Sequence, residues 1–480
     1  MARRVLFNTV QYAWFFAIVF VVSWLLAGKP RSRQVFLLIA SYVFYGTWDW
    51  RFMGLLFLST ATDYVVGLRM GRVSKERRRG WLLASLFVNL GVLGFFKYFN
   101  FFTDSAVRLI ESAGFHASVP TLSIVLPVGI SFYTFQTMAY TIDVYRGRTE
   151  VCRDPIVFGL YVAYFPPLVA GPIERAQNLI PQLFKSPTSF SGTEASKALF
   201  LIGIGLIKKV AIGDYLAVNL VDRVFESPSS YSSLEMLTGI YGFAVQIYCD
   251  FSGYTDIAIG SAALLGIKLT QNFDSPYKAR NVQEYWRRWH ISLSNWLRDY
   301  LYFPLGGSKH GTYKTYRNLM ITMVLGGLWH GAGWNYVIWG FVHGVMLCVT
   351  RAWQRFRGGA KPRAHGAWSI AIHVVLVFLT FNFAAITRVF FRPDSFQKSI
   401  NRLHQLFAFT TYHPNLHKWV LVALIIGLVS HYTPDKLFEW AKDKYAASPW
   451  YIQGAILFGV AFVLREAATA EAVRFIYFQF

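Results

Sequence analysis

Charged residues are scarce in this sequence. Only 15% of its 480 residues are Asp, Glu, Lys or Arg, whereas soluble proteins carry about a quarter. Hydrophobic residues make up 54% of the chain and aromatic residues 18%. This composition excludes an ordinary soluble globular protein and indicates an integral membrane protein surrounded by lipid.

Acidic residues and cysteines are few. There are 25 Asp and Glu against 47 Lys and Arg, which gives a formal net charge of +22. The basic residues cluster at 69–79, 146–153, 278–317 and 351–363. Positive loops are typical of the cytoplasmic side of a membrane, and some are expected to meet anionic lipid headgroups or an anionic cofactor. No soluble basic domain is present, so nucleic acid is not an expected partner. The three cysteines lack metal or redox spacing, and no metal is expected.

Mostly apolar stretches recur along the whole chain, and a membrane-spanning helix needs roughly 20 such residues. They are 10–27, 35–48, 52–68, 81–96, 122–142, 156–169, 198–221, 234–265, 319–350, 368–391, 419–429 and 451–464. Several are short, and one is interrupted by Lys208, Lys209 and Asp214, which favours tilted, broken or re-entrant segments. The pattern predicts an all-α polytopic integral membrane protein with about ten to twelve membrane segments.

The longest charge-free run, residues 319–350, contains His330 and His343. As one helix of about 32 residues it would be roughly 48 Å long, against a hydrocarbon core of about 30 Å. We therefore predict a break at Gly331–Gly333, because glycine tolerates non-helical backbone. Two interpretations of His330 stay open: it faces a polar space at the break, or it is a core histidine bonded to a neighbouring helix. His343 is interpreted as a packing or interfacial residue, with a chemical role as the alternative.

Residues 282–301, VQEYWRRWHISLSNWLRDYL, show apolar residues at helical spacing opposite a basic face. They predict one amphipathic helix at the membrane interface. His290 lies at the edge of its apolar face, either as an ordinary boundary histidine or pointing into the protein. Asp250 and Asp256 are six residues apart and point in different directions, so they predict a hydrogen-bonded helix contact, with catalysis as the alternative.

Several motifs carry a resemblance to a known family. EYWRRWHISLSNWLRDYLYFPLGGS (284–308) and NLMITMVLGGLWHGAGWNYVIWGFVHG (318–344) resemble the core of the membrane-bound O-acyltransferase family, in particular its bacterial alginate O-acetyltransferase type. Further segments are similar to that type, so the resemblance covers nearly the whole chain. They are LLIASYVFYGTWDWRF, LPVGISFYTFQTMAYTIDVYRG, FPPLVAGPIERAQNLIPQL, QIYCDFSGYTDIAIGSAALLGI and the chain end FIYFQF.

The resemblance implies a fold and a chemistry. Members are polytopic helical proteins with a central tunnel, and they move an acyl group from a thioester to a hydroxyl. It implies one membrane-embedded acyltransferase domain over residues 1–480, with a core at 246–350. His330 matches the family's active-site histidine, expected to take the hydroxyl proton in a site kept poor in water by Trp329 and Trp334. His290 matches the second histidine of the bacterial branch, expected to orient the donor or polarise its carbonyl.

The resemblance also implies a donor, an acceptor and a location. The donor is expected to be acetyl-CoA arriving from the cytoplasm, and the acceptor an exported polysaccharide such as alginate. Periplasmic partner proteins are expected to carry the acetyl group to the polymer, from a protein of the bacterial inner membrane. Charge and position, rather than the resemblance, indicate which residues are expected to hold the donor, and these are basic or aromatic: Lys278, Arg280, Arg287, Arg288, Trp289 and Arg298.

Other functions stay open. The same enzyme could acetylate cellulose, peptidoglycan or another glycan, or pass a D-alanyl group toward teichoic acid. A secondary transporter would also contain broken helices and polar groups at mid-membrane, but it often shows internal repeats, and the motif-bearing core occurs once. A structural scaffold is disfavoured because it has no need of His330.

Overall fold

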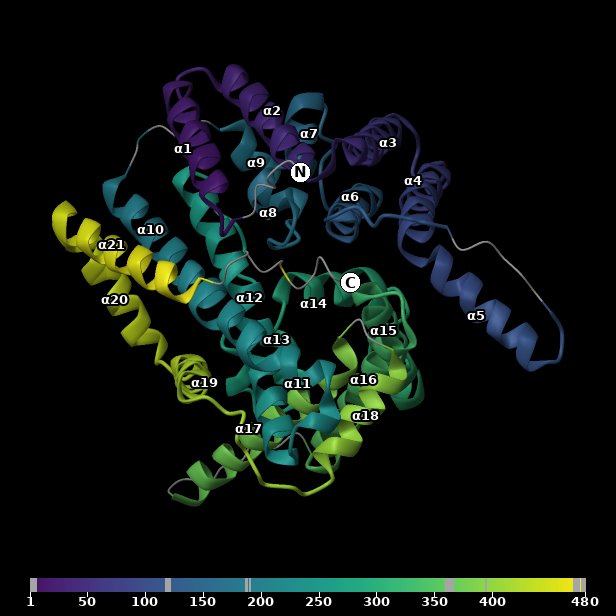
Figure 1. Cartoon of the computed structure of the whole chain (residues 1–480). Helices are drawn as coiled ribbons and strands as arrows, with labels where there is room; N and C mark the ends of the chain where they lie inside the picture. The colour runs from purple at the N-terminus through teal and green to yellow at the C-terminus, as the bar shows by residue number, and fades with distance from the viewer. Residues whose placement is uncertain are drawn as a thin grey trace. The chain divides into compact units, whose positions relative to one another are not determined.

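The computed structural model describes residues 7–116, 122–185, 189, 191–358, 367–392, 395–468 and 475. Every regular element within these ranges is helical, and the α-helices are numbered α1 to α21 (Figure 1). The prediction of an all-α protein is therefore confirmed. The chain forms two compact units. The first comprises Met1–Phe190, Ala262–Leu269 and Gly331–Gly333, and the second comprises Ser191–Ser261, Thr270–His330 and Trp334–Phe480.

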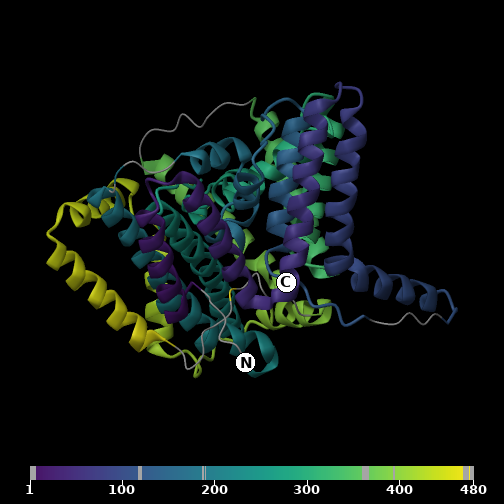
Figure 2. The same cartoon turned by 90° about the horizontal axis from the view of Figure 1, so that it is seen from above.

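The first unit begins with long helices and ends with short ones. They are α1 (Val10–Leu25), α2 (Pro30–Asp49), α3 (Met53–Arg72), α4 (Arg78–Leu93), α5 (Phe99–Ser112), α6 (Ile130–Tyr145), α7 (Pro155–Ala163), α8 (Phe165–Leu168) and α9 (Ala176–Phe184). Helices α3, α4 and α6 run side by side, as Figure 2 shows, and α7 packs against both α2 and α3.

Asp63, an acidic residue within an apolar helix, holds α3 to its neighbour. Ser85 Oγ of α4 donates to Asp63 Oδ1 at 2.5 Å, and Asn89 Nδ2 donates to Asp63 Oδ2 at 2.9 Å. An unpaired polar group is costly in an apolar environment, and these bonds satisfy the carboxyl group. We therefore interpret Asp63 as a structural residue of the helix packing.

The second unit alternates long helices with short and irregular ones. They are α10 (Gly192–Leu206), α11 (Asp222–Glu226), α12 (Ser233–Leu264, in this unit as far as Ser261), α13 (Val282–Arg288), α14 (Ile291–Leu297), α15 (Gly311–His330), α16 (Trp334–Phe356), α17 (Ala367–Thr387), α18 (Phe396–Leu406), α19 (Lys418–His431), α20 (Asp435–Ala447) and α21 (Trp450–Ala467). A π-helical segment, Ile207–Asp214, follows α10 and brings Gly213 close to the backbone of α12.

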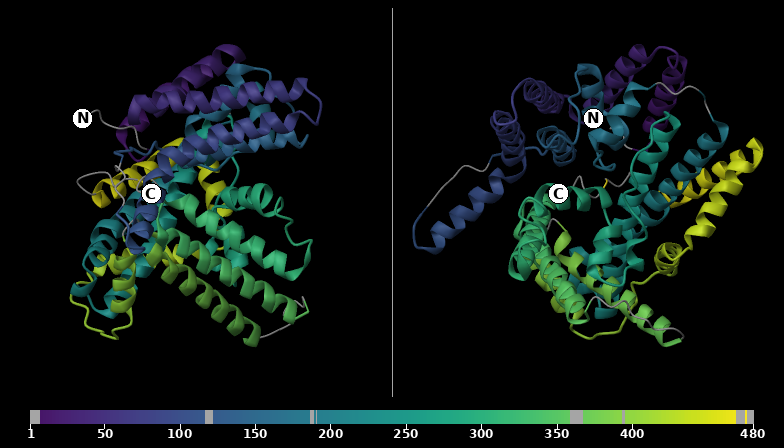
Figure 3. Two further views of the ribbon diagram at one scale, coloured as in Figure 1. Left: turned by 90° about the vertical axis from the view of Figure 1, so that its right-hand side faces the viewer. Right: turned by 180° about the vertical axis from the view of Figure 1, so that it is seen from behind.

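The charge-free run forms a hairpin. Helix α15 ends at His330 and α16 begins at Trp334, so the predicted break at Gly331–Gly333 is confirmed. The two helices run side by side, seen as neighbouring green ribbons in Figure 3. Gly327 and Gly340 face each other: a Cβ on Gly340 would collide with the Met323 carbonyl group. The backbones therefore touch directly at this crossing, which only glycine permits.

Three of the described helical segments are long and apolar enough to cross a membrane: Arg78–Ser112, Trp334–Phe356 and Trp368–Phe391. A fourth is added if Lys418–His431 and Asp435–Ala447, bent by 98°, form one broken span. The protein is thus an integral membrane protein by composition and helix content. The count of ten to twelve segments stays a prediction, because the other described helices are too short, or not apolar enough over 18 residues, to be identified as spans.

Candidate active site

His330 lies at the tip of the α15–α16 hairpin, and its side chain is 3% exposed. Three aromatic rings surround the imidazole: Trp329 at 5.0 Å, Trp339 at 5.2 Å and Phe391 at 4.9 Å between ring centroids. Trp334, which was expected to help bury His330, is 56% exposed instead. The apolar surroundings of His330 are therefore built by Trp329 of α15, Trp339 of α16 and Phe391 of the 3₁₀ turn Arg388–Phe391 that follows α17.

His290 interrupts the predicted interfacial helix. The prediction of one helix over 282–301 is wrong, because α13 ends at Arg288, α14 begins at Ile291, and His290 adopts φ 44° and ψ 58°. The left-handed region is rare for residues other than glycine and often marks a functional site. The turn directs the imidazole inward, where it is fully buried. This outcome favours the inward-pointing interpretation of His290.

Asn272 fixes the orientation of His290. Its Oδ1 accepts from the Ser292 N–H at 3.2 Å and from Ser292 Oγ at 2.9 Å, and lies 3.1 Å from His290 Nδ1. Since Oδ1 is an acceptor in these bonds, Nδ1 of His290 carries the proton and Nε2 carries the lone pair. His290 lies between two short helices, and burial lowers its pKa to about 3. The imidazole is therefore neutral at physiological pH.

The two histidines share one neighbour. The Trp329 indole lies 6.0 Å from the His290 ring and 5.0 Å from the His330 ring. The structure thus brings both predicted histidines to the same aromatic cluster within the second unit. His343, in contrast, packs against Trp339 and Phe383 at 4.6 and 4.9 Å, and its Nε2 lies 3.1 Å from Thr387 Oγ1. These contacts favour the packing interpretation of His343.

A cavity of about 330 Å³ opens beside this cluster. Arg287, Arg298 and Arg351 line it together with Trp286. The Arg351 Nε and Trp286 Nε1 atoms are buried and lack hydrogen-bond partners among the described residues. Available donors and three guanidinium groups suit an anionic, phosphate-bearing ligand. Trp286 lies 5.7 Å from Trp339, which borders His330, so two indole rings separate the cavity from the histidine.

The other residues predicted to hold the donor lie elsewhere. Lys278 Nζ is 3.4 Å from Asp435 Oδ1, and Arg288 pairs with Asp274 at 3.0 Å. Arg280 pairs with a carboxylate on α13. Trp289 is buried under the Arg388 guanidinium group at 4.5 Å. Of the predicted set, the structure therefore brings only Arg287 and Arg298 to the cavity.

Arg388 was not recognised from the sequence. It is buried at the end of an apolar stretch and donates to the Tyr277 and Tyr285 hydroxyl groups. Its guanidinium group also packs on Trp289, directly before His290. An arginine inside an otherwise apolar stretch was the signal available, because such residues are costly and rarely lie there without a role.

Lys208 and Lys209 form an ion-pair network that sequence patterns also missed. Lys209 Nζ lies 2.6 Å from both Asp214 Oδ1 and Asp250 Oδ1, and Lys208 Nζ lies 2.7 Å from Asp256 Oδ2. The predicted polar helix contact at Asp250 and Asp256 is therefore found, with lysines as the partners. We interpret it as the joint between the π-helical segment and α12.

The site defines a class: a helical membrane protein with two buried histidines in an aromatic cluster beside a basic cavity. Residues 154–391 match the model of the MBOAT, membrane-bound O-acyltransferase family. The chain is 40% identical over 424 residues, covering 88% of this chain and 78% of the relative, to a "probable alginate O-acetylase AlgI" of Pseudomonas aeruginosa. It is also 36% identical over 430 residues, covering 83% and 79%, to a peptidoglycan O-acetyltransferase of Helicobacter pylori.

More distant similarity extends to a teichoic acid D-alanyltransferase of Bacillus subtilis, 27% identical over 54% of this chain and 67% of that relative. The chain belongs to the membrane-bound O-acyltransferase family. It is an O-acyltransferase, as its resemblance to the family implied.

Proposed function

We propose that this enzyme transfers acetyl groups from cytoplasmic acetyl-CoA toward the hydroxyl groups of an exported polysaccharide such as alginate. In this proposal it lies in the bacterial inner membrane, and periplasmic proteins complete the transfer to the polymer. About ten to twelve segments of one domain, residues 1–480, enclose a tunnel through the membrane. The observation that supports the chemistry most strongly is the placement of His290 and His330 around Trp329, next to a basic cavity.

In the proposed reaction, His330 accepts the proton of the attacking hydroxyl group. The oxygen then bonds to the thioester carbonyl carbon, the carbon–sulfur bond breaks, and the proton passes to the departing CoA thiolate. The buried indole N–H group of Trp339, next to His330, lacks an acceptor among the described residues, and we assign it to donate to the carbonyl oxygen as that oxygen gains charge. The aromatic surroundings limit hydrolysis of the thioester.

The role proposed for His290 follows from its tautomer. With Nδ1–H directed at Asn272 Oδ1, Nε2 is an acceptor, so a neutral His290 accepts a proton or orients a donor group at Nε2. Polarising the donor carbonyl would need a proton on Nε2, which the Asn272 contact disfavours. We therefore assign His290 to orienting the reacting groups.

Replacing Asn272 with Asp is expected to make the enzyme lose activity at acidic pH. A carboxylate facing Nδ1 favours the imidazolium form and raises the pKa of His290, so the variant loses activity as pH falls below neutral. In the wild type, the pKa of about 3 keeps His290 neutral from pH 5 to 8, and His290 imposes no loss in that range. Parallel pH profiles of kcat for both proteins provide the measurement. Two superimposable profiles would contradict the assigned role of Asn272.

The acceptor is proposed from the relatives. Alginate is favoured by the relatives described as alginate O-acetylases, which match 38 to 42% of aligned residues. Peptidoglycan is the second candidate, supported by the 36% identical peptidoglycan O-acetyltransferase. The acetyl content of each polymer, isolated from cells with and without this enzyme, separates the two.

The donor is tested with the purified full-length protein, labelled acetyl-CoA and a periplasmic acceptor fraction. Replacing Arg287 and Arg298 with Gln is expected to raise KM for acetyl-CoA about 10²- to 10⁴-fold, because two charge-assisted bonds to phosphate are lost and each contributes about 1.5–3 kcal/mol. Replacing Lys309 and Lys314 with Gln removes the same charge outside the cavity and should leave KM unchanged. An unchanged KM in the arginine variant, or an equal rise in the control, would reject this cavity as the donor site. If the wild-type enzyme transfers no labelled acetyl group to any periplasmic acceptor fraction, acetyl-CoA is rejected as the donor.

A further inference from the structure

We propose that the first unit binds an anionic phospholipid, with the phosphate in an arginine-lined cleft and an acyl chain in an adjoining apolar groove. Both cavities lie within residues 38–184. The site is independent of the histidines and of the donor cavity.

The cleft has a volume of about 1600 Å³ and joins two basic clusters that are far apart in sequence. Arg72 ends α3 and Arg78 begins α4, and Arg148 and Arg153 lie in the connection between α6 and α7. None of the four guanidinium groups forms an ion pair with a carboxylate of the described residues. Four such groups around one space are a recognition site for phosphate.

The acidic residues of the cleft do not cancel this charge. Asp154 is already bound: Arg31 Nη1 lies 2.7 Å from its Oδ2, and its Oδ1 caps α7 by accepting from the Ile156 and Val157 N–H groups. Glu150 is the remaining carboxylate on the cleft wall. The cleft therefore keeps an excess of positive charge, which an anionic ligand would complement.

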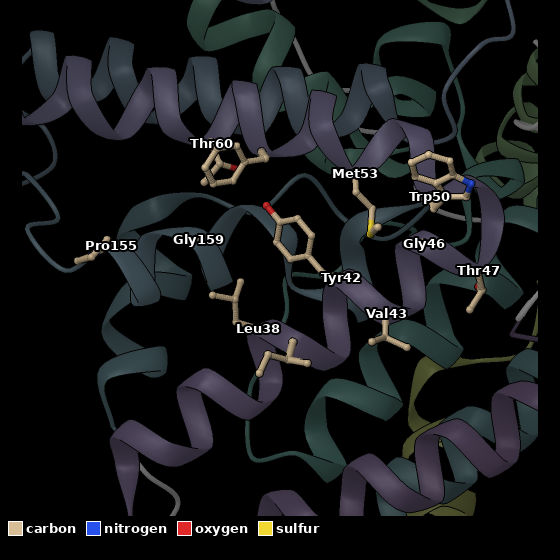
Figure 4. Close-up of a pocket in the computed structure, with 12 residues that line it drawn as sticks. Leu38, Tyr42, Val43, Gly46, Thr47, Trp50, Met53, Thr60, Pro155 and Gly159 are labelled. Carbon is tan, nitrogen blue, oxygen red and sulfur yellow. The ribbon is translucent and has the colours of Figure 1, made fainter.

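The groove is almost wholly apolar and has a volume of about 610 Å³. Figure 4 shows Leu38 and Val43 of α2 facing it from one side and Met53 of α3 from the other, while the Tyr42 hydroxyl group turns toward Thr60. Trp50 stands at one end of the groove and is 71% exposed. An open apolar channel bordered by the exposed side chains of Ile39, Val43 and Phe57 fits a hydrocarbon chain.

Two observations indicate that the groove and the cleft adjoin. Pro155 lines both. One face of α3 also lines both, at residues spaced three or four apart: Met53, Phe57, Thr60, Tyr64, Leu68 and Gly71. This spacing keeps the side chains on one stripe, which extends about 27 Å along the helix axis. The space along this stripe is apolar in the groove and is bordered by arginines in the cleft, which matches the apolar chain and charged headgroup of a phospholipid, whereas a soluble phosphate compound would match the cleft alone.

The test measures binding of a tail-labelled fluorescent phosphatidylglycerol to the full-length protein after lipid removal in detergent. Replacing Arg148 and Arg153 with Gln is expected to weaken binding about 25-fold, because each basic residue near an anionic lipid contributes roughly fivefold. The matched control replaces Arg77 and Arg79 with Gln, which removes the same charge beside the cleft but not on its wall. It is expected to bind like the wild type.

A second variant, Val43→Trp, narrows the groove without changing charge and is also expected to weaken binding. Thermal unfolding of each variant shows that it is folded. The proposal is overturned if phosphatidylcholine binds as tightly as phosphatidylglycerol, or if the Arg77 and Arg79 control loses as much affinity as the cleft variant. It is also overturned if free CoA or glycerol 3-phosphate displaces the lipid at equal concentration, since the ligand would then be a soluble phosphate compound.

Discussion

Replacing His330 with Gln is expected to lower the rate of acetyl transfer by about 10²- to 10⁴-fold, the range contributed by a positioned general base. Glutamine nearly preserves side-chain size and polarity but cannot take up a proton at neutral pH. The loss should appear in kcat, because the aromatic walls that Trp339 and Phe391 provide are unchanged. Release of free CoA in the presence of acceptor provides the measurement.

His404→Gln is the matched control for this experiment. His404 is an exposed histidine on α18, outside the aromatic cluster, and its replacement should leave the rate unchanged. Thermal unfolding of both variants separates a chemical loss from a folding defect. A His330→Gln enzyme that is folded and retains more than about a tenth of wild-type activity would contradict the role of His330 as the base.

Replacing Lys209 with Met is expected to destabilise the protein by about 3–5 kcal/mol, the cost of leaving buried charges without their partner. The Lys209 side chain is 1% exposed, and its ammonium group lies 2.6 Å from carboxylate oxygens of both Asp214 and Asp250. Methionine fills similar space, so the change acts mainly through charge. Thermal unfolding in detergent, followed by tryptophan fluorescence, provides the measurement.

Lys208→Met is the neighbouring comparison. The Lys208–Asp256 pair is partly exposed, with side chains 25% and 18% accessible, so water stabilises the remaining carboxylate and a smaller loss is expected. Adding Asp214→Asn and Asp250→Asn to Lys209→Met should recover part of the stability, because no charge is then left buried. Equal losses for the two lysine variants would show that the Lys209 network does not dominate the stability of this region.

The sequence was sufficient to predict features that depend on composition and local glycine chemistry. Charge scarcity predicted the all-helical membrane class, and Gly331–Gly333 predicted the break that places His330 at the end of α15. The resemblance to a known family selected His290 and His330 from eleven histidines as the candidates for the chemistry. Neither inference required knowledge of which helices pack together.

Features that depend on long-range packing could not be predicted. The regular apolar spacing of 282–301 indicated one helix, but Asn272, eighteen residues before His290, holds that histidine in a left-handed turn. Lys208 and Lys209 were interpreted only as an interruption of an apolar stretch. Their partners on α12, Asp256 and Asp250, lie more than forty residues further along the chain. Helical periodicity describes one element at a time and carries no information about such pairs.

The direct backbone contact between α15 and α16 has a consequence for biogenesis. Because the Gly327–Gly340 crossing joins residues close in sequence, the hairpin closes only a short loop, and short loops close quickly and at low entropic cost. We expect this pair to assemble soon after its synthesis, before more distant helices dock. His330 would then lie on a preformed helical hairpin against which later segments pack.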